Sequence, residues 1–98
     1  MFDKAKKLWK AQSVAKRLRR ELKEMTFEGA ELGGKVRVVV DGEQKVQAVE
    51  IAAELLNPSE KEAVERFLRQ ATTSAITKSQ QAAAQRMKGV AGDLGLNL

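Results

Sequence analysis

The sequence predicts an α+β fold: a long helix, then a two- or three-stranded antiparallel sheet, then a second long helix. Three observations predict this order. Residues 3–25 contain no Gly or Pro, the β-branched run 35–42 ends in Asp-Gly, and Asn57-Pro58 opens a further helix-forming stretch. The 98 residues have the length of one domain, so residues 1–98 are expected to form a single domain.

The first helix is rich in Ala, Leu, Lys, Arg and Glu, which are good helix formers. Its apolar residues recur at spacings of three and four, as in the a and d positions of a coiled coil. These residues are Leu8, Ala11, Ala15, Leu18, Leu22 and Met25. The pattern predicts one apolar face that packs against another element.

The sheet is predicted from the next 27 residues. Residues 35–42 place Val36, Val38 and Val40 on one face, and Asp41-Gly42 is a strong turn signal. Residues 44–52 are expected to return as the second strand. Their apolar residues fall in both alternation phases, which indicates either a bulge or burial on both sides. Residues 26–31 are a candidate third strand.

The second helix is expected to run from Pro58 to about Lys88. Asn57 fits the N-cap, Pro58 fits the first helical position, and Glu60 is placed for a capping box. The apolar side of this helix is traced by Val64, Phe67, Leu68, Ala71, Ala75, Ile76, Ala82, Ala83 and Met87. Residues 89–98 carry three Gly residues without a clear period and are expected to form a flexible tail.

These two helices would measure roughly 35 and 45 Å, which is long for a compact domain of this size. A small sheet cannot cover both along their length, and the simplest partner for the surplus apolar surface is a second copy of the chain. The residues expected at this homodimer interface are Leu8, Ala11, Ala15, Leu18, Leu22, Val36, Val38 and Val40.

Composition excludes several functional classes. The absence of His and Cys removes the usual general base, the thiol nucleophile and most transition-metal ligands. No phosphate-cradling glycine motif occurs, and Gly33-Gly34 fits a loop hinge better than an anion nest. We therefore expect no enzyme, cofactor, metal site or small-molecule substrate. No apolar run is long enough to span a membrane, and no secretory signal is evident at the start.

Charge is concentrated in the first helix. Residues 1–25 carry nine basic and three acidic side chains, a net charge of +6, whereas the other 73 residues have a net charge of −1. A solvated helix surface usually mixes both signs. The charge therefore favours a polyanionic partner, with nucleic acid ahead of a bland solvated face and of an acidic membrane or protein surface. The expected DNA-binding residues are Lys6, Lys10, Lys16, Arg17, Arg19, Arg20 and Lys23.

Trp9 lies among these basic residues and off the apolar pattern of the helix. It could pack under another helix, stack on a base or sit among lipid headgroups, and packing against protein is favoured of the three. The narrow apolar face of this helix offers little area for insertion into lipid.

The order of elements resembles the YbaB/EbfC family of bacterial nucleoid-associated proteins. The resemblance is carried by residues 27–68, with Gly33-Gly34 before the strand, Asp-Gly closing it, and Val49-Glu50-Ile51 followed by Leu55-Leu56. The ending "MKGVAGDLGL" is also similar to that of the family. In contrast, the family's first helix is often rich in Gln, Met and Glu, whereas this one is basic.

The resemblance implies an intertwined, tweezer-like homodimer that binds double-stranded DNA without catalysis. It also implies a cytoplasmic location on the nucleoid and a role in chromosome organisation or gene regulation. Phosphate contacts alone do not separate DNA from RNA, so a protein associated with RNA or the ribosome remains an alternative. The other is a dimeric scaffold that binds an acidic protein.

Overall fold

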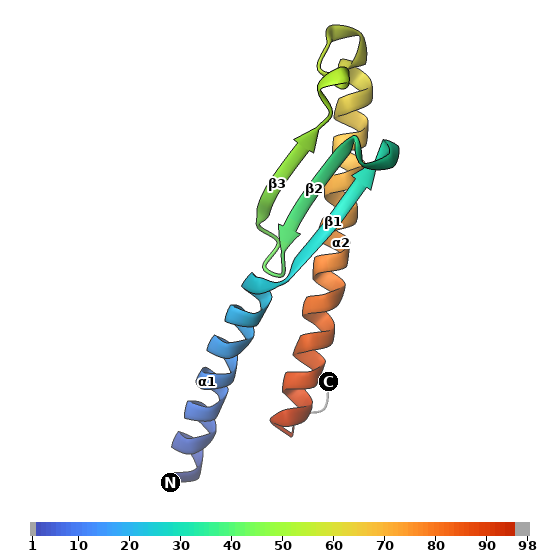
Figure 1. Ribbon diagram of the computed structural model, residues 1–98. Helices are drawn as coiled ribbons and strands as arrows, with labels where there is room; N and C mark the ends of the chain where they lie inside the picture. The colour runs from blue at the N-terminus through green and yellow to red at the C-terminus, as the bar shows by residue number, and fades with distance from the viewer. Residues whose placement is uncertain (1, 96–98) are drawn as a thin grey trace.

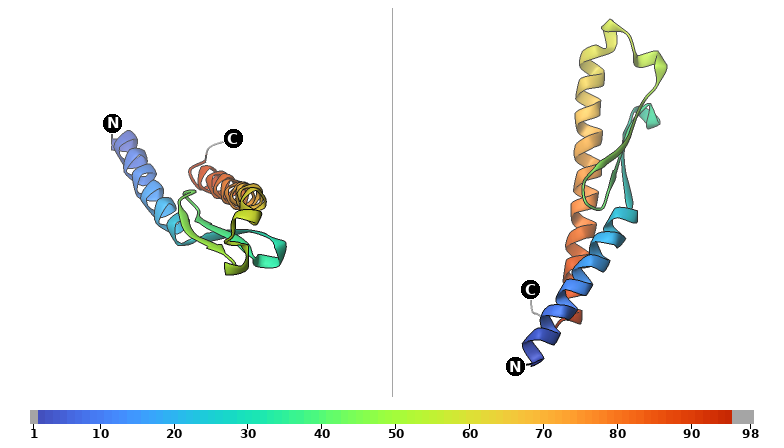
Figure 2. Two further views of the ribbon diagram at one scale, coloured as in Figure 1. Left: turned by 90° about the horizontal axis from the view of Figure 1, so that it is seen from above. Right: turned by 90° about the vertical axis from the view of Figure 1, so that its left-hand side faces the viewer.

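The computed structural model describes residues 2–95 and has the predicted α+β architecture (Figure 1). Along the chain, helix α1 comes first, a three-stranded antiparallel sheet follows, and helix α2 comes last. Their bounds are α1 Phe2–Glu24, β1 Thr26–Glu31, β2 Val36–Asp41, β3 Val46–Ile51 and α2 Lys61–Asp93. The chain is elongated, with principal extents of 68 × 20 × 17 Å. Both helices extend beyond the sheet at the end that carries the two termini (Figures 1 and 2).

The sheet has the order β1-β2-β3, so the candidate third strand at residues 26–31 is confirmed. Between β2 and β3 the register shifts, because Val39 pairs with Ala48 whereas Val40 pairs with Val46. Gln47 is therefore the extra residue of a β-bulge. The bulge explains the two alternation phases in β3, and it places Val46 and Val49 on the same face of the sheet.

The core lies between α2 and the first two strands, which α2 covers. Val36, Val38 and Val40 are fully buried there together with Ala71 and Ala75 of the same chain. The prediction that the three valines form a homodimer interface is therefore wrong. Their side chains are already covered by α2 and have no surface left for a second chain.

Helix α2 begins differently from the prediction. Pro58–Glu60 forms a separate 3₁₀ turn, and the Asn57 side chain makes no hydrogen bond to the free backbone N–H groups of that turn. Instead, the Asn57 amide donates to the Glu54 carbonyl and accepts from the Ser59 hydroxyl. The predicted capping box is therefore wrong, whereas Pro58 does take the first position of the turn.

Helix α2 also ends later than predicted. It continues to Asp93, so the expectation of a flexible tail is wrong for Gly89–Asp93, and residues 96–98 lie outside the described part. Its later half is held by small buried residues, Ser79 and Ala91. The predicted apolar residue Met87 is instead about half exposed.

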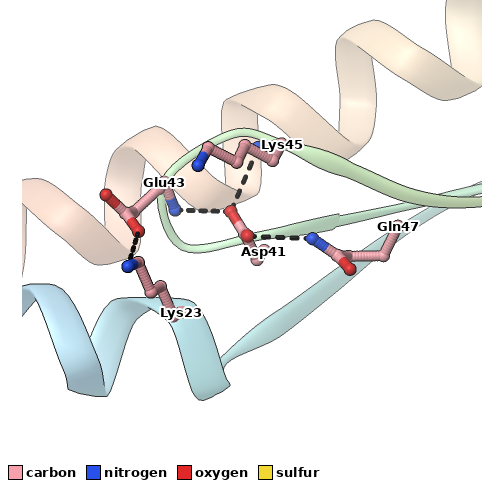
Figure 3. Close-up of polar contacts among 5 residues, drawn as sticks. All are labelled: Lys23, Asp41, Glu43, Lys45 and Gln47. Carbon is pink, nitrogen blue, oxygen red and sulfur yellow. Dashed lines mark hydrogen bonds and ion pairs between the residues drawn. The ribbon is translucent and has the colours of Figure 1, made fainter.

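The β2–β3 turn is organised by the buried carboxylate of Asp41 (Figure 3). Its Oδ1 accepts hydrogen bonds from the backbone N–H groups of Glu43 and Lys45, at 2.8 and 3.0 Å. Its Oδ2 accepts one from the Gln47 side chain at 2.9 Å. The Ser79 hydroxyl of α2 donates to the Asp41 carbonyl at 2.8 Å. The turn is thus tied both to itself and to α2.

Replacing Asp41 with alanine is expected to lower the free energy of unfolding by about 2–3 kcal/mol, because three donors lose their acceptor in a partly buried place. Gln47→Ala removes one of the three bonds and should cost about 1 kcal/mol. Urea denaturation of both variants measures the difference. Equal losses would show that the backbone bonds of the turn contribute nothing.

Candidate nucleic-acid interface

The β2–β3 turn lies beside the C-terminal end of α1 (Figure 3). It fixes the direction of this helix relative to the sheet. The Gly42 N–H donates a 2.8 Å hydrogen bond to the carbonyl of Leu22, in the last turn of α1. A Cβ at Gly42 would lie only 2.4 Å from that oxygen, so only glycine permits this approach. Beside it, Lys23 Nζ lies 4.0 Å from Glu43 Oε1. The end of α1 is therefore anchored to the hairpin.

Further along α1, Val14 and Leu18 are buried between the two helices. They line a small cavity of about 160 Å³ whose far wall includes Arg86 and Val90 of α2. Glu21 of α1 and Arg86 form an ion pair across the two helices at 3.3 Å. These contacts decide which face of α1 is inward and which is left for another molecule.

The buried face of α1 differs from the predicted one by a small rotation. Leu18 lies on it as predicted, but Val14, which the sequence analysis missed, occupies the place assigned to Ala15. Leu8 is 59% exposed and Ala15 is also exposed, whereas Ala11 and Leu22 are partly buried. The rest of the chain therefore does not cover Leu8 and Ala15, and their role in a dimer stays a prediction.

The outward face of α1 is basic. At about 100° per residue, Trp9, Lys16 and Arg20 follow one line along the helix, roughly opposite Leu18. Lys6 and Arg19 flank this line on either side. All of these side chains are exposed. We call Lys6, Trp9, Lys16, Arg19 and Arg20 the outward basic face.

Among residues 2–95, no carboxylate lies within ion-pairing distance of the four cations of the outward basic face. The remaining predicted DNA-binding residues differ. Arg17 lies 3.9 Å from Glu21, Lys23 faces Glu43, and Lys10 lines a cleft beside Leu94 near the end of α2. The structure therefore separates the seven cations into an open set of four and a set of three near other groups.

The sheet carries a different electrostatic pattern. Arg37 on β2 binds Glu28 of β1 at 2.8 Å and Glu50 of β3 at 3.1 Å. These hydrogen bonds, with Glu28 first, raise the pKa of the Arg37 guanidinium above its ordinary value. Charge on this face is therefore paired across three strands, and the unpaired positive charge is concentrated on α1.

The described residues offer little else of chemical interest. No group of three carboxylates that could hold a metal ion occurs within residues 2–95. Over the same range, neither helix combines the length and the apolar character that a bilayer span requires. The outward basic face is the candidate site that remains.

Comparison with known proteins identifies the family of the chain. The sequence profile of the YbaB/EbfC DNA-binding family matches residues 1–94, nearly the full chain. The chain belongs to this family. Members similar to it include nucleoid-associated proteins from Syntrophobacter fumaroxidans and from a Cyanothece strain. They are 33% and 34% identical, over 99% and 98% of this chain and 86% of each relative.

A solved structure also resembles the chain. It belongs to an uncharacterized protein from Helicobacter pylori and superimposes with a TM-score of 0.66 over 96% of both chains. Only 22% of residues are identical, so the likeness establishes the fold and nothing further. The arrangement of elements is thus shared with that solved protein, and the basic character of α1 is read from this chain's own residues.

Proposed function

We propose that the protein is a non-catalytic, homodimeric DNA-binding protein that contacts duplex phosphates through the outward basic face of α1. In this role it organises the chromosome or regulates genes within the cytoplasmic nucleoid. The observation that carries the proposal is the concentration of unpaired positive charge on the exposed helix α1 in a member of a DNA-binding family.

The arrangement suits backbone contacts. Lys16 and Arg20 lie one helical turn apart, and Lys6 lies about 15 Å before Lys16 along the axis. Long cationic side chains on one face of a rod can reach successive phosphates of a duplex and release condensed counterions. The face offers no set of Asn or Gln side chains for bidentate base reading. Binding should therefore depend strongly on salt and weakly on sequence.

Dimerisation is supported by apolar surface that the chain leaves uncovered. Val46 and Val49 of β3 lie on the α2 side of the sheet, yet they are 53% and 51% exposed. The reason is that α2 covers β1 and β2. Leu56, just after β3, is also exposed and borders an apolar groove with Val64. A second copy placed here would bury this surface and join the two basic arms in one molecule.

A salt titration of binding to two unrelated duplexes of equal length tests the proposal. With roughly six phosphate contacts per dimer, log K against log salt should have a slope of about −5 on both duplexes. Structured RNA of the same length serves as competitor. Stronger competition by RNA than by unlabelled duplex would favour an RNA-associated protein, and a dimer without any shift at about 100 mM salt would favour a scaffold for an acidic protein.

Replacing Val49 with lysine is expected to shift the protein from dimer to monomer, because two added charges would be buried at the contact. The half-exposed position should tolerate lysine within one chain. Sedimentation equilibrium measures the mass, which should fall from twice 10.8 kDa to 10.8 kDa. Thr77→Lys, on an exposed part of α2, is the control and should remain dimeric. A dimeric Val49→Lys variant would place the interface elsewhere.

A further inference from the structure

Trp9 is the most exposed large apolar side chain of the described residues, at 77%. It is also the only tryptophan in the chain. A free indole in water forgoes a large favourable burial energy, so an exposed tryptophan in the middle of a functional surface indicates a contact made on binding. The question is which kind of molecule covers it.

The surroundings of Trp9 answer this question. On the helix surface its neighbours at three and four residues are Ala5, Lys6, Gln12 and Ser13, and Lys16 lies two turns after Trp9 along the same line. Of the three acidic residues of α1, Glu21 pairs with Arg86 of α2, Asp3 lies about 120° around the helix from Trp9, and Glu24 lies about 22 Å from Trp9 along the axis. A protein surface that covered the indole would have to take these ammonium groups out of water as well. A polyanion with apolar faces between its charges can cover the indole and also pair with the ammonium groups.

DNA has this composition, because phosphates flank stacked apolar bases. We propose that Trp9 inserts its indole at a base step of weakened stacking while Lys16 and Arg20 hold the neighbouring phosphates. Aromatic and apolar side chains act in this way where the duplex is kinked or a base is unpaired. The ligand class is thus DNA that contains an unstacked or easily unstacked step. The inference rests on the proposed function and adds a structural preference to it.

The consequence is a measurable preference. Inserting the ring into an intact duplex requires unstacking first, whereas a single unpaired nucleotide already supplies the opening. The wild-type protein should therefore bind a duplex with one unpaired nucleotide about tenfold more tightly than the same duplex fully paired, within the range known for base–aromatic stacking. The phosphate contacts are nearly the same in the two duplexes. The ratio of the two affinities therefore measures the contribution of the indole.

The test compares dissociation constants for the two duplexes, at one salt concentration, for wild type, Trp9→Ala and Trp9→Phe. The substitutions lie at an exposed position and should not impair folding. Trp9→Ala is expected to bind both duplexes with equal affinity, so the ratio of the two dissociation constants should fall from about ten to about one. Trp9→Phe should retain part of the preference. The wild-type indole fluorescence should be quenched more by the duplex with the unpaired nucleotide.

The test distinguishes failure of DNA binding from failure of indole insertion. If wild type binds neither duplex, the proposed function falls and the inference falls with it. If wild type binds both duplexes equally, with unchanged indole fluorescence, the inference is overturned while phosphate binding stands. If the fluorescence changes with protein concentration in the absence of DNA, a contact between copies covers Trp9, and insertion is again overturned.

Discussion

Replacing Gly29 with valine is expected to remove a large part of the protein's free energy of unfolding. Gly29 lies in β1 where α2 crosses the sheet, and a Cβ built there would lie 1.8 Å from the carbonyl oxygen of Ala71. The neighbour is helix backbone rather than a flexible side chain, so no rotamer change relieves the overlap. Helix α2 would have to move away from β1, which separates the core residues on both elements.

The expected loss is at least about 3 kcal/mol, because overpacking against fixed backbone lies at the upper end of the usual range. Domains of this size have a total stability of about 5–15 kcal/mol, so the loss is a large part of it. Urea denaturation followed by circular dichroism measures the change. A variant with native stability would mean that α2 does not pack on β1 at Gly29.

Gly89→Ala is the matched control, since it adds the same first carbon to a glycine in α2. Nothing lies within 4 Å of a Cβ at Gly89. Alanine is favoured over glycine in a helix interior by about 1 kcal/mol. This variant should therefore be more stable than wild type, opposite in sign to Gly29→Val. Comparing the two variants shows whether the loss of stability comes from the close packing of α2 against the sheet or from replacing any glycine.

The second large effect is expected for DNA affinity in the double variant Lys16→Ala, Arg20→Ala. In a dimer it removes four cations from the outward basic face, which corresponds to four phosphate contacts. Each contact contributes about 0.9 to the salt slope, so the slope should fall from about −5 to about −2. Extrapolated to 0.1 M salt, affinity should fall by about 10³-fold on every duplex.

The control for this variant is Arg66→Ala, Arg69→Ala. Both residues are exposed on the N-terminal half of α2, at the end of the chain opposite the α1 arm (Figure 1). The control removes the same charge from each chain, so a general effect of net charge would weaken both variants alike. A control that loses as much affinity as Lys16→Ala, Arg20→Ala would remove the outward basic face from the proposal.

Much of the fold follows from local signals in the sequence. The Asp41-Gly42 turn, the β-branched strand before it and the glycine-free first helix each carry their own short-range preference. A bulge was one of the two alternatives that the change of phase in β3 left open, and the structure places it at Gln47. The order of elements followed from these signals and pointed to the family, which the family profile confirms, and the solved structure has a similar fold.

The inward face of α1 was harder to predict because two patterns overlap. The spacing Ala11, Ala15, Leu18 is as regular as Ala11, Val14, Leu18, and both fit three- and four-residue steps. The choice depends on where α2 lies, and α2 meets Val14 and Leu18. Tertiary contact therefore selects between two faces that periodicity cannot separate.

The partner of the β2 valines was unpredictable for a related reason. Alternation shows that one face of a strand is apolar, but not whether a helix of the same chain or a second chain covers it. Here α2 covers Val36, Val38 and Val40, and the uncovered apolar residues are instead on β3. The ion pair of Lys23 with Glu43 likewise depends on the fold, whereas Arg17 and Glu21, four residues apart on one helix, form a pair that the spacing alone could have indicated.

The central claim is that DNA lies against the outward basic face of α1. The most direct test is a titration of the isotopically labelled protein with a short duplex, followed by the amide shifts in its NMR spectrum. The largest shifts are expected at Lys6, Trp9, Lys16 and Arg20, with little change in β1 and β2. Shifts concentrated on the sheet or around Arg66 and Arg69, with α1 unaffected, would contradict the claim.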